Sequence, residues 1–586
     1  MKKQLALLLA IALIVVLFSA CGGTKTDSDT PAPETASTGT ATQAPNSGNG
    51  DTTDEESPYN LAAGKYDTGE NNVPLAPYEY PLPLSTTDEV FTYWTCPVLV
   101  DAVPESGYES MEYPAALAEK TGVNIEYLMI AWADRATNFS VLVASDDLPD
   151  LLTNANMFYP GTMQEAVDDD FIVNLYDYKD YMPNYFYEAN NHPEDINVLA
   201  KIMPYPETIY EFWCMESEYV TRNSIGTRGD WLERLGMTNS DIITMDDFHN
   251  LLLMYKTEIG AASPFLLYTS LDPHSMFSAF DTICSATISN VAPPLIENGK
   301  VQFANSRQQD LNFLTMMNQW WNEGLFDPNW MAAEGNPNVM DKILDGSIGV
   351  IGLIPGEAND YSGINNVDPN AYWVPLHKPV LTEDQVFHLG DVRTWIGIGS
   401  WAVSTNCENI PLLVSYCDWF YSPSGVFFSN YGVEGYTFYY DEEGKPMLTD
   451  FLINQPGGMS WALLQYAMND VFEGGVVMRS RTYAIPGGEK LAEFHTFWDD
   501  PNYYRYDGSM AWPTAITFGI EENSRLADLG SDIKTYISEN FLQFVDNSKP
   551  LSEWSSYVAG LEQLGWSEAL EIHQAAYDAF TERFGA

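Results

Sequence analysis

Short apolar strands alternate with helical segments along most of this chain, and this alternation is the feature that most constrains its fold. Residues 89–96 (EVFTYWTC) alternate in polarity and carry aromatic and β-branched side chains, a pattern typical of a strand. Residues 114–121 then predict a helix that ends at Gly122, and residues 123–130 (VNIEYLMI) predict a second strand. The pattern therefore indicates an α/β protein built on a βαβ sheet with helices on both faces.

The same alternation continues to the end of the chain. Further strands are predicted at residues 148–153, 347–354 and 395–403, and further helices at residues 138–144, 163–170, 227–235, 245–257, 306–323 and 409–421. The pattern of the last stretch, about 65 residues long, is almost entirely helical. Because this body is longer than one hydrophobic core normally supports, we expect at least two domains.

The first residues have the pattern of an export signal. Lys2 and Lys3 precede an uncharged apolar run at residues 5–18, and the small residues Ser19 and Ala20 precede Cys21. Such a run is too short for a spanning helix, and Cys21 stands where bacterial lipoproteins carry their lipidated cysteine. An ordinary secretory signal that happens to end near a cysteine is the alternative.

A polar segment follows this signal. Residues 22–57 are rich in Thr, Ser, Gly, Pro, Asn and acids, with almost no large apolar side chain. A segment of this composition cannot bury enough surface to offset its ordering entropy, so we expect a disordered tether with a reach of about 30 Å. Together, a lipid on Cys21 and this tether would hold a globular body near a membrane surface.

Charge and cysteine usage exclude several classes of function. The net charge of −56 disfavours nucleic acids and anionic lipid headgroups. It weighs less firmly against a polyanionic ligand, because a local arginine cluster could reverse the charge inside one cleft. No two cysteines have the C-x-x-C spacing, and no two histidines the H-x-x-x-H spacing, so the sequence carries no metal signature. Buried free thiols are expected for the remaining cysteines, although one disulfide is possible: Cys96, Cys214, Cys284, Cys407 and Cys417.

Six segments resemble, in the same order, those of the large extracellular solute-binding lipoproteins of sugar importers. They are residues 117–126 (LAEKTGVNIE), 145–150 (SDDLPD), 171–184, 227–236 (TRGDWLERLG), 421–435 and 551–577. The resemblance is to family 1 of the solute-binding proteins of ABC importers, in its oligosaccharide-binding subgroup. It implies the two-lobe periplasmic-binding-protein fold of type II, in which two hinge-linked α/β lobes hold the ligand in the cleft between them.

The resemblance also implies a division of the chain. Residues 1–20 would be the lipoprotein signal peptide, and residues 21–57 the lipidated cysteine and tether. Residues 58–212 and 395–470 would form mainly the N-terminal lobe, and residues 213–372 and 471–586 mainly the C-terminal lobe. The crossings between the lobes are expected near residues 209–219 and 372–377.

The partners and location follow from the same resemblance. A monomer would be anchored by its lipid on the outer face of the cell membrane and would deliver a carbohydrate to the permease subunits of an ABC importer. No cofactor is expected. Many relatives carry a calcium loop after the D-W-L-x-x-L-G element, but residues 254–264 lack the alternating carboxylates that calcium needs, so we predict no calcium there.

Sugar recognition pairs aromatic faces with the C–H faces of the rings, and polar side chains with the hydroxyls. Seven side chains at strand ends or in loops are the candidates for ligand contact: Trp94, Trp132, Arg135, Arg393, Trp395, Tyr436 and Trp512. For each tryptophan the alternative is packing in a core or between the lobes. Arg228 and Asp230 belong to the resemblance but are expected to stabilise the start of a helix.

Two other functions stay open at this stage. A secreted glycoside hydrolase needs only two carboxylates beside a bond, and with 82 acids such pairs occur by chance. No G-x-S-x-G, H-E-x-x-H or P-loop pattern is present, so we predict no catalytic residue and no enzyme activity. A peptide-binding receptor on the same fold is the nearer alternative, because a fold does not fix its ligand.

Overall fold

The structure is a computed structural model, and residues 57–586 form one compact unit within it. It describes residues 57–95, 103–145, 147–192, 195–266, 278–286, 291–327, 329–330, 338–363, 366–455, 458–467 and 473–585. The predicted signal peptide, Cys21, the tether and Cys96 lie outside these residues.

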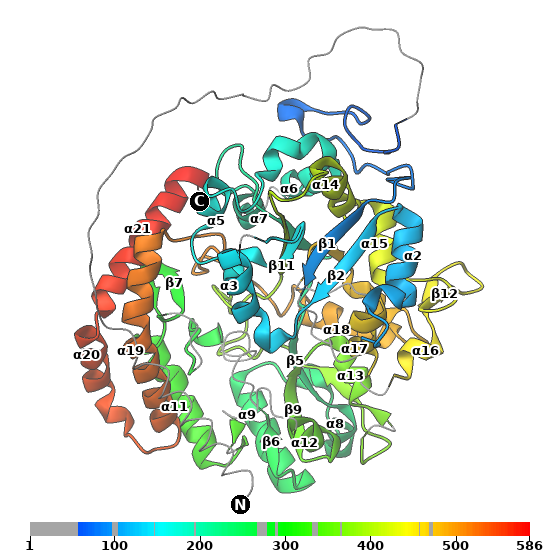
Figure 1. Cartoon of the computed structure of the whole chain (residues 1–586). Helices are drawn as coiled ribbons and strands as arrows, with labels where there is room; N and C mark the ends of the chain where they lie inside the picture. Colours follow the sequence, from blue (N-terminus) through cyan, green and yellow to red (C-terminus); the bar gives the residue numbers. More distant parts are fainter. Residues whose placement is uncertain are drawn as a thin grey trace, which may run out of the picture. The chain divides into compact units, whose positions relative to one another are not determined.

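A six-stranded sheet forms the first of two sheets, with the order β14-β4-β11-β3-β1-β2 (Figure 1). Its strands are β1 (Val90–Thr95), β2 (Asn124–Met129), β3 (Leu151–Thr153), β4 (Phe212–Glu216), β11 (Ile396–Val403) and β14 (Val476–Val477). Strand β11 runs antiparallel to its neighbours β3 and β4, whereas β1, β2, β3, β4 and β14 share one direction. The carboxyl ends of those parallel strands and the beginning of β11 therefore lie at the same edge.

Side chains of this sheet alternate between two buried clusters, as the period of two in a strand requires. Tyr93 and Leu151 contribute to one cluster, and their neighbours Trp94 and Leu152 to the other. The helices that supply the rest of the two clusters are α2 (Glu112–Thr121), α3 (Arg135–Ser145), α4 (Ala155–Phe158), α5 (Met163–Asp168), α6 (Pro183–Asn190), α7 (Ile196–Ile202), α14 (Ile410–Trp419) and α15 (Pro423–Tyr431). The prediction of helices on both faces is confirmed.

A four-stranded sheet of order β10-β5-β9-β6 is the second layer. It consists of β5 (Ser224–Arg228), β6 (Ser263–Phe265), β9 (Ile348–Leu353) and β10 (Trp373–Pro375). Strand β5 runs antiparallel to both of its neighbours, while β6 and β9 are parallel. Each sheet thus contains one strand that opposes the direction of the others.

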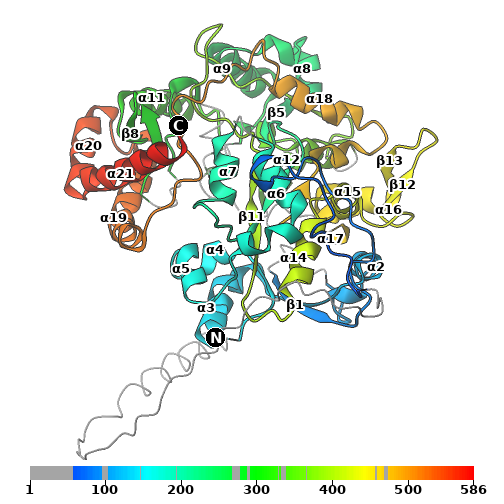
Figure 2. The ribbon, with the colours of Figure 1, turned by 90° about the horizontal axis from the view of Figure 1, so that it is seen from above.

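Two clusters also flank this second sheet. One is filled by α8 (Gly229–Leu235), α9 (Met245–Met254), α11 (Gln308–Asn322), α19 (Ile520–Val545), α20 (Trp554–Gln563) and α21 (Trp566–Phe584). Figures 1 and 2 show the last three in orange to red, beside green α11. The other is filled by α12 (Asn338–Leu344), α13 (Pro355–Asp360), α16 (Asp450–Ile453), α17 (Met459–Tyr466) and α18 (Glu489–Trp498).

Two hairpins and several short helices complete the described elements. The hairpins are β7 (Pro294–Glu297) with β8 (Lys300–Phe303), and β12 (Phe438–Tyr440) with β13 (Pro446–Leu448). The short helices are η1 (Glu70–Asn72), η3 (Tyr108–Ser110), η4 (Trp132–Asp134), η5 (Leu175–Tyr181), η6 (Asn239–Asp241), the π-helical η7 (Tyr255–Ile259), η8 (Ser278–Phe280), η11 (Arg479–Tyr483) and η12 (Leu551–Glu553).

Local signals place several helix ends where the sequence predicts them. Thr244 and Asp247 form a capping box at the start of α9, which satisfies two backbone N–H groups of the first turn. Gly122 ends α2 in the left-handed conformation, at a φ of 67°. The helix predicted at residues 227–235 begins later, at Gly229, because Thr227 and Arg228 pair with β9 and β10 as part of strand β5.

The chain passes repeatedly between the two sheets. Strand β4 leads to β5 through residues 217–223, and β10 leads to β11 through residues 376–395. Residues of α15, β12, β13, α16 and α17 contribute to the cluster beside α18, although β11 before them and β14 after them belong to the six-stranded sheet. The lobe boundaries deduced from the sequence remain a prediction.

Candidate functional site

Three passages between the sheets lie side by side at one edge of the six-stranded sheet, and we call this region the junction (residues 215–221, 391–396 and 476–481). The backbone N–H of Glu216 donates to the carbonyl of Trp395 at 2.9 Å, and the N–H of Ser217 donates to the carbonyl of Val477 at 3.0 Å. The carboxyl ends of β4 and β14 and the beginning of β11 are therefore joined directly. In open α/β sheets, ligands bind outside the carboxyl ends of the strands.

Carboxylates of the first passage bind the third passage. Glu216, which is buried, forms an ion pair with Arg479, whose Nε donates to Oε2 at 2.7 Å. Glu218 accepts from the backbone N–H of Arg479 at 2.9 Å and from the hydroxyl of Ser480 at 2.6 Å. These contacts fix the relative position of the two passages in this conformation.

Aromatic rings join the first passage to the second. The Trp395 indole stacks on the imidazole of His192 at a centroid distance of 4.2 Å and on the ring of Tyr219 at 5.3 Å. The guanidinium of Arg393 lies 5.1 Å from the ring centroid of Tyr219 and 5.1 Å from that of Tyr504. We call these five residues the junction stack. It runs from His192, two residues after α6, to Tyr504, which belongs to the core beside the second sheet.

Charge keeps the middle of this stack in place. Asp391 accepts from Nε of Arg393 at 2.9 Å and from Nη2 at 2.7 Å, and the carboxylate is almost fully buried. Burial alone would lower the pKa of Arg393, but these hydrogen bonds and the charge of Asp391 raise it above its usual value. Burial lowers the pKa of the neighbouring Lys378 to about 8, while its ammonium donates to the carbonyl of Gly390 and the hydroxyl of Tyr504.

A pocket of about 490 Å³ opens at the junction, and we call it the junction pocket. Its volume lies within the range of small-ligand sites, about 300–1,000 Å³. Carboxylates, an amide, a hydroxyl and aromatic rings share its lining with apolar side chains. The lining residues are Pro77, Glu188, Asn191, His192, Met215, Glu216, Ser217, Trp395, Tyr421, Pro423, Val426, Phe427, Val476 and Met478.

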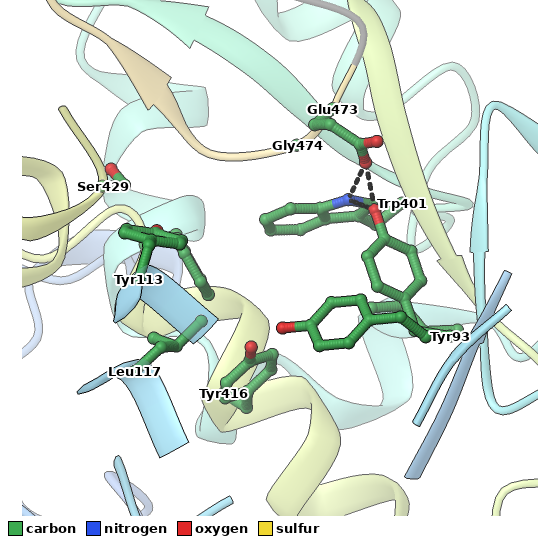
Figure 3. Close-up of a pocket in the computed structure, with 11 residues that line it drawn as sticks. Tyr93, Tyr113, Leu117, Trp401, Tyr416, Ser429, Glu473 and Gly474 are labelled. Atoms are coloured by element: carbon green, nitrogen blue, oxygen red, sulfur yellow. Dashed lines mark hydrogen bonds between the residues drawn. The ribbon is translucent and has the colours of Figure 1, made fainter. Parts of the chain in front are cut away.

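A buried carboxylate precedes β14 and holds that strand in the sheet. Glu473 accepts hydrogen bonds from the hydroxyls of Tyr93, Thr95 and Thr153 and from the indole Nε1 of Trp401, as Figure 3 shows in part. Burial raises the pKa of Glu473 above its usual value, against the opposing effect of these four donors. The cavity beside it is only about 30 Å³, room for about one or two water molecules, so it is not a site for a solute.

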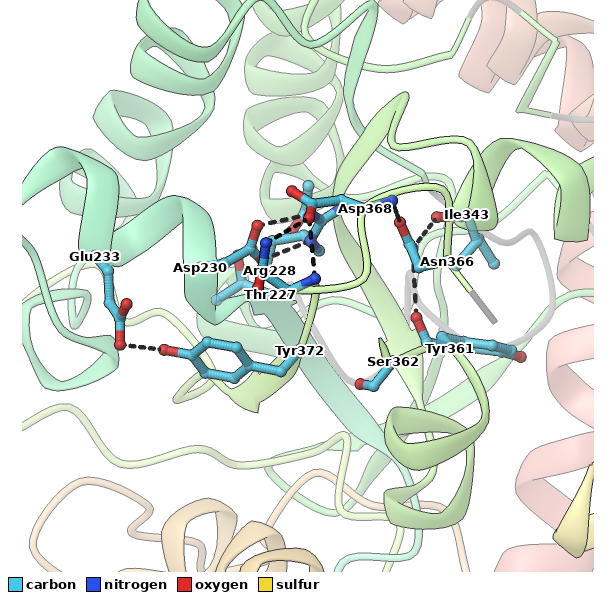
Figure 4. A network of polar contacts seen from close by, with 12 residues as sticks. Thr227, Arg228, Asp230, Glu233, Ile343, Tyr361, Ser362, Asn366, Asp368 and Tyr372 are labelled. Atoms are coloured by element: carbon cyan, nitrogen blue, oxygen red, sulfur yellow. Dashed lines mark hydrogen bonds and ion pairs between the residues drawn. The ribbon is translucent and has the colours of Figure 1, made fainter. Parts of the chain in front are cut away.

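The resemblance segment at residues 227–236 forms the corner between β5 and α8. Arg228 is buried and binds Asp230 through Nε and Nη2, both at 2.7 Å (Figure 4). Its guanidinium also lies 4.8 Å from the Trp231 ring centroid. Tyr372 donates to Glu233 across the same corner at 2.7 Å. Asp230 lies in the first turn of α8, where the helix dipole favours a carboxylate, and Arg228, the residue before that turn, holds this carboxylate in place.

The structure separates the seven candidate ligand residues. Arg393 and Trp395 lie together in the junction, and Trp395 alone lines the junction pocket. Trp94 is 1% exposed, packs against Phe139 and Phe158, and donates to Asn138 at 2.7 Å, so it is a core residue rather than a ligand contact.

The remaining candidates lie elsewhere. Arg135 begins α3 and sits over the Phe158 ring at 5.8 Å, whereas Trp132 begins η4 and its side chain lies outside the described part. Tyr436 packs against Phe451 at 4.9 Å, and Trp512 packs near His573 of α21 at 5.6 Å.

Sequence reasoning missed several residues of the junction. His192, Glu216, Tyr219, Phe427 and Arg479 were not candidates, although Glu216 and Tyr219 fall within the first predicted crossing. Aromatic and acidic residues inside a predicted crossing are the signal that could have identified these two. The others come from the segment after α6, from α15 and from the segment after β14, whose proximity only the folded chain shows.

Solved structures that resemble this chain are two-lobe solute-binding proteins. An alginate-binding protein, AlgQ2, solved without calcium ion, has a TM-score of 0.64 at 19% identity and covers 84% of this chain and 99% of its own. An HMO-binding solute-binding protein associated with an ABC transporter of Bifidobacterium longum infantis has a TM-score of 0.65 at 16% identity, with the same coverage. The S. pneumoniae substrate-binding protein FusA, as an EF-hand mutant in complex with fructo-nystose, has a TM-score of 0.59 at 20% identity and covers 84% of this chain and 100% of its own.

The chain has the two-lobe solute-binding fold. The fold predicted from the sequence is thereby confirmed, since these matches extend over almost the entire length of each solved protein. No family model matches the sequence, and a search of curated proteins finds no match.

Within the described residues, no group of three or more His, Cys, Asp or Glu side chains could hold a metal ion. The helices of the same residues include none that is both long and apolar enough to cross a membrane. The four cysteines that the structure describes (Cys214, Cys284, Cys407 and Cys417) are buried, and no disulfide joins any two of them.

Proposed function

We propose that this protein is an extracellular receptor that captures a carbohydrate and delivers it to an ABC importer. The observation that carries the proposal is the similarity, over 84% of this chain, to an alginate-binding protein, to an HMO-binding protein and to a substrate-binding protein solved in complex with fructo-nystose. The junction pocket supports it chemically, because Trp395 and Phe427 supply aromatic surface while Glu188, Asn191 and Glu216 supply acceptors and donors for hydroxyls.

A neutral carbohydrate fits this pocket better than an acidic one. Its lining contains Glu188 and Glu216, and the chain as a whole carries a net charge of −56. Arg479 balances the charge of Glu216, so an anionic sugar would meet repulsion from Glu188 and from the net charge of the chain. The ligand would be bound and released intact, because the candidate site offers aromatic stacking and hydrogen bonding rather than an arranged acid and nucleophile.

The proposal also includes a membrane anchor and protein partners. Cys21 would carry the lipid that anchors the chain to the outer face of the membrane, and the permease subunits would be its protein partners. We expect labelled palmitate to be incorporated into the expressed full-length chain and not into a Cys21→Ala variant, which should be released into the medium. Incorporation by the variant would exclude Cys21 as the anchor.

Ligand-induced stabilisation tests the receptor function. The unit formed by residues 57–586 would be screened by thermal shift against maltooligosaccharides, cellooligosaccharides, fructooligosaccharides, oligoalginate, peptides and divalent cations. A ligand at about a hundredfold excess over Kd stabilises the folded state by about 2.7 kcal/mol. A shift with one glycan family, which is recovered uncleaved, supports the proposal. A shift with peptides alone, or a cleaved glycan, contradicts it.

One substitution locates the site. Trp395→Ala should weaken glycan binding by about tenfold, since a lost stacking contact costs about 1 to 1.5 kcal/mol. Trp321→Ala is the matched control, because Trp321 is a half-buried tryptophan of α11 that does not line the junction pocket. Equal loss of binding in both variants would indicate general destabilisation instead of a ligand contact.

A further inference from the structure

An aromatic path leads from the junction pocket to the surface of the molecule. Phe427, on α15, lines the pocket and also stacks on Tyr440 of β12, with a centroid distance of 6.4 Å and an interplanar angle of 3°. Phe438, which is buried, packs edge-on against both Phe427 and Tyr440 at 5.4 Å. The ring of Tyr440 therefore packs against Phe427 and Phe438, and Phe427 also lines the junction pocket.

Tyr440 is unusually open for a ring in such a cluster. Its side chain is 47% exposed, whereas Phe438 on the same face of the strand is 4% exposed. The hairpin that carries it is short and well paired, with Tyr440 opposite Pro446 and Tyr439 opposite Met447. Asp441 closes its turn by accepting from the backbone N–H groups of Glu443 and Lys445. A rigid hairpin thus presents one face of Tyr440 to solvent.

We infer that Tyr440 is an outer stacking subsite for the sugar residues of an oligosaccharide whose first part lies in the junction pocket. This inference rests on the function proposed above and adds that the receptor selects longer chains. A supported aromatic ring offers a flat apolar face to the C–H face of a sugar at little conformational cost. Glu442 and Glu443 beside it are exposed carboxylates, which accept hydrogen bonds from hydroxyls and disfavour an acidic glycan.

Other occupants fit this face less well. The hairpin turn, residues 441–445 (DEEGK), carries three acids and one lysine, so an anionic headgroup or nucleic acid would be repelled. A protein partner would be expected to use a broader apolar patch than one tyrosine ring. Because Phe427 both lines the junction pocket and contacts Tyr440, we favour a single ligand that reaches from the pocket to Tyr440.

Chain-length ladders test the inference. Affinities of wild type, Tyr440→Ala and Tyr439→Ala for malto-, cello- and fructooligosaccharides would be measured by titration calorimetry, from the disaccharide to the longest soluble member. Tyr439 is the matched control, since it is 42% exposed on the same strand but points to the opposite face. Tyr440→Ala should weaken binding of the long members about threefold to tenfold, leave the disaccharide unchanged, and differ from Tyr439→Ala.

The possible results separate the two proposals. If no glycan of any ladder binds the wild type, the receptor function fails and this inference fails with it. If glycans bind but Tyr440→Ala leaves the long members unchanged, only the outer subsite is refuted. The same holds if the variant weakens the disaccharide as much as the long members, or if Tyr439→Ala has an equal effect. Unchanged melting temperatures of both variants would show that folding is not the cause.

Discussion

Replacing Glu473 should reveal whether its charge or only its hydrogen-bonding geometry holds β14 in the sheet. The side chain is 5% exposed and accepts from Tyr93, Thr95, Thr153 and Trp401. Glu473→Ala leaves these buried donors without their acceptor. The hydroxyls can rotate toward other partners, and the indole Nε1 of Trp401 keeps the hydroxyl of Tyr93, at 2.7 Å, as its remaining acceptor. A buried donor left unsatisfied costs about 1–3 kcal/mol of unfolding free energy, and the cavity left by the shortened side chain adds to this cost.

Glu473→Gln should be far milder. Three of the four donors point at one carboxylate oxygen, Oε2, and the fourth, Thr95, points at Oε1 at 2.7 Å. A glutamine with its carbonyl oxygen at the Oε2 position keeps the first three bonds, and its amide can donate to the hydroxyl of Thr95 instead. Because burial already raises the pKa of Glu473, replacing the ionisable group by a neutral one removes a costly buried charge. We expect a change of about 1 kcal/mol or less.

Urea unfolding of residues 57–586, followed by tryptophan fluorescence at neutral pH, would measure both variants. The reasoning predicts a large loss for Glu473→Ala and nearly wild-type stability for Glu473→Gln. Equal destabilisation by both would refute it, because the charge would then be essential to the network. A third variant, Glu473→Met, keeps the volume but offers no acceptor of comparable strength, so it should resemble Glu473→Ala.

Two further predictions concern stability. His377 is buried between the rings of Phe497 and Tyr503, at centroid distances of 3.9 and 4.1 Å, and burial lowers its pKa to about 4. The imidazole is therefore protonated at higher pH in the unfolded chain than in the folded chain. As the pH drops from about 6.5 to about 4, the contribution of His377 to the unfolding free energy falls by up to about 3 kcal/mol. His377→Phe keeps the stacking and lacks the titration, so its unfolding free energy should rise relative to wild type over that range; parallel pH profiles would contradict this. Gly122→Ala should lower the melting temperature by several degrees, because φ is 67° and a Cβ would lie 1.9 Å from the carbonyl oxygen of Ser85. Gly236→Ala is the control. Its φ is 72° but the space around it is open, so its melting temperature should fall clearly less.

Regular elements were predictable because each depends on nearby residues. The alternation in residues 89–96 and the apolar run in residues 347–354 correspond to β1 and β9, within a residue at each end. The wrong helix start at Thr227 has a tertiary cause: the backbone of Ser224–Arg228 is paired on both sides by β9 and β10. A pattern read along the chain does not contain these partners.

The candidate site was less predictable, and Trp94 shows why. Its place at the end of a parallel strand is typical of ligand contacts, and the sequence correctly gives that place. Its indole is nevertheless covered by Phe139 of α3 and Phe158 of α4, helices whose docking against the strand is not encoded near residue 94. Trp395 has the same kind of position, at the start of a strand, but its neighbours His192 and Tyr219 stack on it without removing it from the pocket.

Trp395 contacts both the passages between the sheets and the junction pocket, which the proposed receptor function would require to act together. Its carbonyl accepts from Glu216 of the first passage, its ring stacks on Tyr219 of the same passage, and its remaining surface lines the junction pocket. Any rotation of one lobe against the other must change the backbone angles of these passages, because they are the links between the sheets. A ligand that stacks on Trp395 would therefore have different affinities for conformations that differ in these passages. Binding can shift the lobes toward one conformation only through such a difference in affinity.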